Sequence, residues 1–166
     1  LNKMSESLKE RGPDSSGEFI DKKNQISIMH RRLSIMDLSS LGNQPMTSTN
    51  DRYVIAFNGE IYNHHSIRKN LNDNNLEEGY AWKGSSDTET LLAAIEKIGI
   101  NEAIKVCVGQ FAIAIWDKKN KYLYLIRDRL GEKPLYYGFF KDIFYFGSDL
   151  RAFKADPYFQ PKVDKE

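Results

Sequence analysis

The sequence predicts an α+β sandwich in which layers of β-sheet are covered from outside by helices. Three observations support this fold class. Strand-like runs occupy the first third of the chain, helical patterns follow in the middle, and four short apolar runs separated by polar turns fill the last third. Strands, then helices, then strands again in one chain are typical of sheets with helices packed on their outer faces.

The first segment, residues 1–10, has apolar side chains at every third or fourth position, which fits the last turns of a helix. The pair Gly12-Pro13 cannot continue a helix, so we expect it to end there. Residues 26–35 alternate well enough for a strand, and residues 41–46 are expected to be loop. The run Tyr53–Phe57 is apolar and mostly β-branched or aromatic, which indicates a buried strand.

The middle of the chain favours helices. Residues 63–72 have apolar positions at helical spacing, and the polar stretch 72–79 is expected to be an exposed connection. Ser86 and Glu89 have the spacing of a capping box ahead of an apolar stripe, so we predict a helix from Ser86 to about Ile98. A second short helix is expected from Asn101 to Cys107.

The last third favours strands, because it is rich in Tyr and Phe. Polar turns separate four candidate strands, which suggests an antiparallel meander. These are Gln110–Trp116, Tyr122–Arg127, Leu135–Phe139 and Ile143–Phe146. A short helix over Asp149–Lys154 follows, and residues 156–166, with two prolines and many charges, have the composition of a domain exit or linker.

Composition sets the limits on function. With 166 residues, the chain suits one domain with a sizeable core. The formal net charge of +1 gives no indication of a nucleic-acid or membrane partner, and no apolar run approaches the length of a membrane-spanning helix. A single cysteine excludes an internal disulfide framework and fits a reducing compartment, so the cytoplasm is the expected location.

The stretch Asn58-Gly59-Glu60 directly follows the predicted strand Tyr53–Phe57. Asn58 offers a side-chain amide and Gly59 a backbone N–H, two donors that could stabilise an oxyanion formed during acyl transfer. Glu60 could hold the ammonium group of a substrate. The alternative is a plain hairpin turn, since Asn-Gly is the usual sequence of such turns.

Further polar clusters lie at the ends of predicted elements, where active sites usually form. Arg32 could bind a carboxylate through two parallel hydrogen bonds, and Asp87 could join Glu60 around an ammonium group. Together with the two donors, these residues would suit a free amino acid. Asp87 could instead serve only the helix dipole.

Five motifs in one order resemble those of the glutaminase domain, a class II glutamine amidotransferase, of glutamine-hydrolysing asparagine synthetases. They cover nearly the whole chain. The motifs are Arg11-Gly12-Pro13-Asp14, Arg32-Leu33-Ser34-Ile35, Asn58-Gly59-Glu60-Ile61-Tyr62-Asn63, Gly84-Ser85-Ser86-Asp87-Thr88-Glu89 and Arg127-Asp128-Arg129-Leu130-Gly131-Glu132-Lys133-Pro134-Leu135-Tyr136-Tyr137.

The resemblance implies an N-terminal-nucleophile hydrolase fold, a four-layer αββα sandwich of two antiparallel sheets. It implies that an N-terminal cysteine attacks the side-chain amide of glutamine, forms a thioester and releases ammonia to a synthetase domain. Asn58 and Gly59 match the oxyanion hole, which is catalytic. Arg32 matches the residue that binds the glutamine carboxylate, and Glu60 and Asp87 match those around its ammonium group.

The chain departs from the family pattern at its start. It begins at Leu1 where the resemblance implies a cysteine and a first strand, so we expect a glutaminase domain over residues 1–155 that lacks this segment and is inactive alone. Residues 156–166 are expected to lead to an ATP-dependent synthetase domain of the same chain, which amidates aspartate. ATP and magnesium are expected there, and no cofactor in the glutaminase domain.

Other interpretations stay open. The chain could be a non-catalytic scaffold or interaction module, or the glutaminase-like domain of a β-lactam synthetase homologue. A homodimer is compatible with the sequence. Cys107 invites assignment as a nucleophile, but its apolar neighbours favour a core position. The three histidines lack the spacing of a metal site, and Arg127, Asp128 and Arg129 are expected to form a structural ion-pair network.

Overall fold

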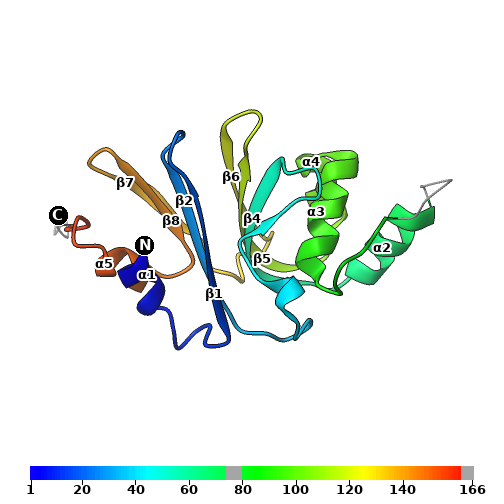
Figure 1. The fold of residues 1–166 in the computed structure, drawn as a ribbon, viewed down its shortest axis with the longest axis horizontal. Helices are drawn as coiled ribbons and strands as arrows, with labels where there is room; N and C mark the ends of the chain where they lie inside the picture. The colour runs from blue at the N-terminus through cyan, green and yellow to red at the C-terminus, as the bar shows by residue number, and fades with distance from the viewer. Residues whose placement is uncertain (74–79, 162–166) are drawn as a thin grey trace.

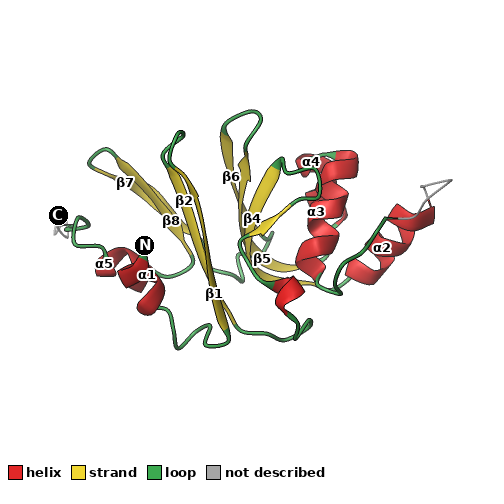
Figure 2. Cartoon of the chain, viewed as in Figure 1, coloured by secondary structure: helices red, strands yellow, loops and turns green. Residues whose placement is uncertain are grey.

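Four layers, in the order helix, sheet, sheet, helix, make up the computed structural model, which describes residues 1–73 and 80–161 (Figure 1). Helices α1 (Asn2–Glu6) and α5 (Leu150–Ala155) lie on one outer side. Helices α2 (His64–Asp73), α3 (Asp87–Ile98) and α4 (Ile100–Val106) lie on the other (Figure 2). The predicted αββα sandwich is therefore confirmed.

The strands pair antiparallel throughout. In chain order they are β1 (Ser15–Asp21), β2 (Ile26–Arg32), β3 (Met46–Thr47), β4 (Tyr53–Ile61), β5 (Gly109–Asp117), β6 (Tyr122–Arg127), β7 (Tyr136–Phe140) and β8 (Ile143–Gly147). One layer is the four-stranded sheet β3-β4-β5-β6, and the other contains the hairpins β1-β2 and β7-β8.

Three apolar clusters hold the layers together, one at each boundary between them. The largest lies between helices α2–α4 and the four-stranded sheet and includes Ile55, Leu91 and Ile113. The second lies between the two sheet layers, around Ile28, Val54 and Trp116. In the third, Tyr145 packs with residues of α5, and Met4 and Leu8 at the N-terminus pack against this cluster. Packing at the layer boundaries removes these apolar side chains from water, which is the main stabilising term of such a fold.

Most predicted elements are confirmed, with shifted ends. The helix predicted from Ser86 is α3, and the Ser86 side chain accepts the N–H of Glu89 as a capping box requires. The helix predicted over residues 1–10 is shorter, and the strand predicted over residues 26–35 ends at Arg32. Residues 74–79, within the predicted connection, lie outside the described residues.

Two predictions about the strands are wrong, and two strands were not predicted. Strand β4 does not end at Phe57 but runs through Asn58 and Gly59 to Ile61, so Asn-Gly makes no hairpin turn. Strands β1 and β3 were not expected. The four last strands do not form one meander, because β5-β6 and β7-β8 belong to different layers. A register of nine residue pairs with β5 carries β4 past the Asn-Gly pair.

The end of the described chain stays close to the domain. Phe159, in the segment expected to be an exit linker, lies 5.2 Å from Phe140 and 5.1 Å from Tyr145, measured between ring centroids. Residues 162–166 of that segment lie outside the described part. Among the described residues, no helix combines the length and the apolar character needed to cross a bilayer.

Candidate functional site

A cavity of about 670 Å³ is lined by residues of both sheet layers, α1 and the start of α3. It brings together all five residues that the sequence singled out. They are Arg32, Asn58, Gly59, Glu60 and Asp87. Strand β2 ends at Arg32, β4 carries the next three, and α3 begins with Asp87, so three elements far apart in sequence meet at this cavity.

Arg32 is a buried cation, 9% exposed. Its Nη1 donates to the carbonyl of Ser39 at 2.7 Å and to Oδ1 of Asn43 at 3.1 Å, and its Nη2 donates to the carbonyl of Asp37. Within residues 1–73 and 80–161, no carboxylate forms an ion pair with it. A buried charge without a counter-ion is costly, so this guanidinium is suited to receiving an anion.

The exposed edge of β4 supplies backbone donors to the cavity. In an antiparallel ladder, alternate residues direct their N–H groups to the same side. The N–H of Phe57 donates to Oε1 of Gln44 at 2.6 Å, and the N–H of Ile61 donates to Oδ2 of Asp87 at 2.9 Å. Gly59 lies between them in the same alternation, so its N–H points to this edge as well.

The hydrogen bonds of β5 confirm that the backbone N–H of Gly59 is not bound by β5. Phe111 is the register partner of Gly59. Its N–H donates to Oδ2 of Asp128 at 3.2 Å and its carbonyl accepts the N–H of Asp128 at 2.8 Å, so both groups point away from β4. Strand β3 covers only Val54 and Ile55. The ladder therefore leaves the N–H of Gly59 without a strand partner.

Gly59 has to be a glycine for steric reasons. A Cβ built on it would lie 2.0 Å from the carbonyl oxygen of Gln110 and 2.7 Å from Cα of Phe111. Both contacts are with backbone, which cannot move aside cheaply. Directly before it, the side-chain amide of Asn58 makes no hydrogen bond to any described residue, while Asn58 itself lines the cavity. One amide and one adjacent N–H are thus available side by side.

Asp87 and Glu60 bring negative charge to the cavity. Burial raises the pKa of Asp87 above its ordinary value, the nearby charge of Glu60 adds to this, and the hydrogen bond from Ile61 opposes it. Asp87 therefore has a structural role, at the first turn of α3 and at the end of β4, as well as a place in the lining. The helix-dipole role considered for it is compatible with both.

The segment before α3 is held by a network of charged and polar groups. The guanidinium of Arg68 donates to the carbonyls of Gly84 and Ser86 at 2.8 and 2.9 Å, and it pairs with Glu89 at 3.1 Å. It also lies 4.0 Å from the ring of Trp82. Glu89 accepts the N–H groups of residues 83 and 84 rather than that of Ser86, so only half of the predicted capping box forms.

Two residues in the lining were not predicted as part of the site. Gln44 and His30 both hydrogen-bond to the backbone of Phe57. From the sequence, Gln44 is expected in a loop, and His30 is one of three histidines without the spacing of a metal site. The short stretch Asn43-Gln44-Pro45 carries no periodicity that would have pointed to this role.

The stretch Arg127–Arg129 at the end of β6 is structural, but in the described part of the chain it is not the ion-pair network that was expected. Arg127 donates to the carbonyls of Gly131 and Lys133, and Arg129 donates to that of Cys107. Asp128 accepts backbone N–H groups, including those of Leu130, Glu132 and Lys133. These bonds hold the pKa of Asp128 at about 2, although burial acts in the opposite direction as the largest single effect.

Cys107 and His64 lie in the interior. Cys107 is 1% exposed and burial raises the pKa of its thiol to about 11, so the predicted core position is confirmed. His64 begins α2 and is buried, whereas His65 next to it is exposed. In the described part of the chain, no cluster of three or more His, Cys, Asp or Glu could hold a metal ion.

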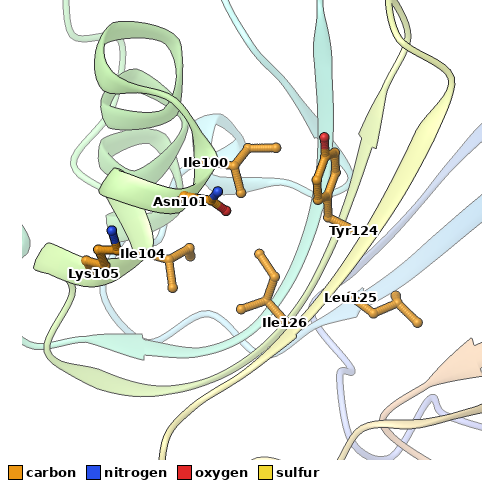
Figure 3. A pocket seen from close by; sticks show the side chains of 7 residues that line it. All are labelled: Ile100, Asn101, Ile104, Lys105, Tyr124, Leu125 and Ile126. Atoms are coloured by element: carbon orange, nitrogen blue, oxygen red, sulfur yellow. The ribbon is translucent and has the colours of Figure 1, made fainter.

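A second, smaller cavity of about 270 Å³ lies between α4 and β6 (Figure 3). Its lining is mostly apolar, with Ile104 and Ile126 facing each other across it and Lys105 as its one charged side chain. It has no set of converging donors and acceptors. The larger cavity is therefore the candidate site.

Comparison with known proteins shows the family to which the chain belongs. A family model described as a glutamine amidotransferase domain matches residues 1–166. The chain is 35% identical to asparagine synthetase (glutamine-hydrolyzing) 3 of Bacillus subtilis (strain 168), over 99% of this chain and 26% of that protein. It is 40% identical to asparagine synthetase (glutamine-hydrolyzing) 1 of the same organism, over 92% of this chain and 23% of that protein.

The chain thus spans about a quarter of the length of these relatives. Among solved structures, it resembles glutamine phosphoribosylpyrophosphate amidotransferase from B. subtilis, in a complex with ADP and GMP. The TM-score is 0.64 at 24% identity, covering 78% of this chain and 29% of that one. At this identity the likeness concerns the fold alone, and it supports the N-terminal-nucleophile amidotransferase fold.

Proposed function

Because the chain belongs to the glutamine amidotransferase domain family, we propose that it binds glutamine in the large cavity and supports hydrolysis of the side-chain amide. The parent protein is proposed to be a glutamine-hydrolysing asparagine synthetase, in which the ammonia amidates aspartate at the expense of ATP. One observation carries the proposal. Arg32, Asn58, Gly59, Glu60 and Asp87 line a single cavity.

Arg32 is proposed to bind the α-carboxylate of glutamine. Its guanidinium is buried, held by carbonyl and amide oxygens, and unpaired by any described carboxylate. Two of its five N–H bonds have no acceptor among the hydrogen bonds of the described residues, which leaves donors for an incoming carboxylate. A planar guanidinium can bind a carboxylate through two parallel bonds, which fixes the orientation of the substrate.

Glu60 and Asp87 are proposed to receive the α-ammonium group. Both line the cavity, and neither forms an ion pair with a described cation. The carboxylate of Asp87 already accepts the N–H of Ile61, so its position is fixed before substrate arrives. An ammonium group there would offset the repulsion between the two carboxylates.

Asn58 and Gly59 are proposed to form the oxyanion hole. When a thiolate attacks the side-chain carbonyl carbon of glutamine, a C–S bond forms and the carbonyl oxygen becomes an oxyanion. The oxyanion then re-forms the carbonyl as the C–N bond breaks, and the amide nitrogen takes up a proton and leaves as ammonia. The free amide of Asn58 and the outward N–H of Gly59 are neutral donors in fixed positions. Each such donor typically lowers the barrier by about 3 kcal/mol.

No residue of the printed sequence is assigned as the nucleophile. In the family that the chain resembles, this role belongs to an N-terminal cysteine. Cys107 is unsuited to it, because its thiol is buried and its pKa is raised to about 11. We therefore propose that residues 1–166 alone release no ammonia from glutamine. The synthetase domain is proposed to bind ATP and magnesium, and the protein to act in the cytoplasm.

The test uses the protein expressed from its complete reading frame. Glutamine should yield equal amounts of glutamate and ammonia, and asparagine should form when aspartate and ATP are added. Asn58→Ala should lower kcat for glutamine hydrolysis about 100- to 1,000-fold. Asn101→Ala, at the small cavity on the far side of the sheet, is the matched control and should keep wild-type activity.

Two outcomes would refute the proposal. One is a folded wild-type protein that releases no ammonia from glutamine. The other is an Asn58→Ala variant as active as the wild type. If glutamine is hydrolysed but aspartate is not amidated, the glutaminase assignment stands and the acceptor assignment fails.

A further inference from the structure

Two side chains occupy the place of a missing strand beside Phe57. Strand β3 pairs Met46 with Ile55, and continuing this register would bring the backbone of Gln44 opposite Phe57. Instead, the N–H of Phe57 donates to the Gln44 side chain at 2.6 Å, and its carbonyl accepts from Nε2 of His30 at 3.1 Å. Both polar groups of one residue are thus bound by side chains from two different segments.

Phe57 directly precedes Asn58, so the contacts that hold its backbone also affect the proposed oxyanion hole. The carbonyl of Phe57 belongs to the same peptide group as the N–H of Asn58. Rotation of that peptide would change the direction of the Asn58 side chain and of the Gly59 N–H two residues on. The Gln44 amide also donates to Oγ1 of Thr88 at 3.3 Å, next to Asp87, so it links the edge of β4 to α3.

The ionisation state of His30 agrees with its role as a donor. A carbonyl oxygen only accepts, so Nε2 must carry the proton. Burial lowers the pKa of His30 to about 4, and the charge of Arg32 contributes in the same direction. The ring is therefore neutral near pH 7, with its single proton on Nε2. Nδ1 is buried and has no hydrogen-bond partner among the described residues.

We propose that His30 and Gln44 are positioning residues that clamp the Phe57 peptide and thereby aim the donors of Asn58 and Gly59 at the oxyanion. This inference rests on the proposed glutaminase function. In this proposal both side chains act through the backbone of Phe57 and not on the substrate carbonyl itself. Their loss should therefore weaken transition-state stabilisation more than glutamine binding.

Kinetics of the protein expressed from its complete reading frame test the clamp. His30→Leu and Gln44→Met should each lower kcat for glutamine hydrolysis about 10- to 100-fold, with KM for glutamine within about 2-fold of wild type, because small displacements at a reacting centre have effects of this size. His30→Gln keeps a donor near the Nε2 position and should retain kcat within about 3-fold. The exposed His65→Leu variant is the matched control and should behave as wild type.

Asparagine formation from free ammonia, which bypasses the glutamine site, should be unchanged in all four variants and verifies that they fold. The clamp is refuted if kcat is unchanged in His30→Leu and Gln44→Met, or if KM rises in step with the loss of kcat. It is also refuted if His30→Gln is as impaired as His30→Leu.

A second measurement does not depend on activity. Histidine-selective ¹⁵N NMR, assigned by loss of the signal in His30→Gln, should show the Nε2–H tautomer of a neutral ring at pH 7. A protonated ring or the Nδ1–H tautomer would refute the geometry. If the wild type hydrolyses no glutamine but the tautomer is as expected, the proposed function fails and the catalytic role of the clamp with it, while the clamp itself stands.

Discussion

The carboxylate of Asp37 accepts the backbone N–H of Ser85 at 2.9 Å, which joins two segments that are 48 residues apart in sequence. Its other oxygen accepts the N–H and the hydroxyl of Ser39 at 2.8 and 2.6 Å. The carbonyls of Asp37 and Ser39 in turn accept hydrogen bonds from Arg32. One buried carboxylate therefore fixes the segment that holds Arg32 against the segment that leads into α3.

Asp37→Asn should lower the unfolding free energy by about 1–3 kcal/mol at pH 7, because buried N–H groups lose a charged acceptor. The hydrogen bonds from Ser39 and Ser85 lower the pKa of Asp37 from 3.8 to about 2. Its stabilising contribution is therefore complete above pH 3.8 and is lost as the pH falls towards 2. Urea unfolding should show a clearly larger difference from wild type at pH 7 than at pH 2.5. The exposed Asp142→Asn variant should unfold as wild type at both.

His30 should make the domain sensitive to mild acid. Its pKa is lowered from 6.5 to about 4, so the unfolded chain binds more protons between these values. Stability should fall by up to about 3 kcal/mol as the pH drops through this window, and the loss should be complete near pH 4. Urea midpoints of His30→Gln should lack this fall. His65→Gln, by contrast, should show it in full, and an equal fall in both variants would contradict the assignment.

Gly59→Ala should destabilise the domain by about 1–3 kcal/mol or more, because the added Cβ would meet the backbone of Gln110. Gly138→Ala provides a matched control in β7. Nothing lies within 4 Å of a Cβ at that position, so the change should stay within about 0.5 kcal/mol. Denaturant unfolding of both variants compares them directly. Equal stabilities would show that the close approach of β4 to β5 is not as described.

Arg32→Lys should raise KM for glutamine about 10- to 100-fold, since a charge-assisted hydrogen bond is worth about 1.5–3 kcal/mol and lysine cannot present two parallel donors. Free ammonia should still support asparagine formation in this variant. The control is Arg151→Lys, on the exposed side of α5. Unchanged KM in Arg32→Lys would exclude the proposed carboxylate contact.

Cys107 should not react with a thiol reagent in the folded protein, because it is buried and the raised pKa leaves almost no thiolate at pH 7. Labelling of residues 1–166 before and after addition of urea gives the measurement. One thiol should become reactive on unfolding only. In the protein from the complete reading frame, Cys107→Ser should keep glutamine hydrolysis, and loss of activity in a folded variant would reopen its assignment as nucleophile.

Sequence periodicity predicted the elements that bury a regular apolar face. The stripe of α3 and the runs of β5 and β6 are examples, since their side chains meet one cluster at the predicted spacing. Strand β1 escaped prediction because its residues alternate between exposed and half-buried positions, with Ser and Gly at its start. Strand β3 is two residues long, too short for any period to show.

The site was predictable as far as side chains with recognisable chemistry define it. Arg32, Asn58 and Asp87 belong to motifs that the sequence displays. The roles of His30 and Gln44 could not be read in this way, because their partner is the backbone of Phe57, on a strand that neither residue belongs to. The continuation of β4 through Asn-Gly likewise depends on β5, whose pairing overrides the local turn preference.

Strand β3 begins only at Met46, and this start determines how much of the edge of β4 is paired. Among the described residues, the ladder beside β4 therefore goes no further than Ile55, and the outward backbone groups beyond Ile55 have no strand partner. In the same register Gly59 would lie opposite residue 42, so a β3 extended by four residue pairs would cover the N–H of Gly59. The shortness of β3 thus keeps this part of the sheet edge unpaired, as the proposed reaction requires.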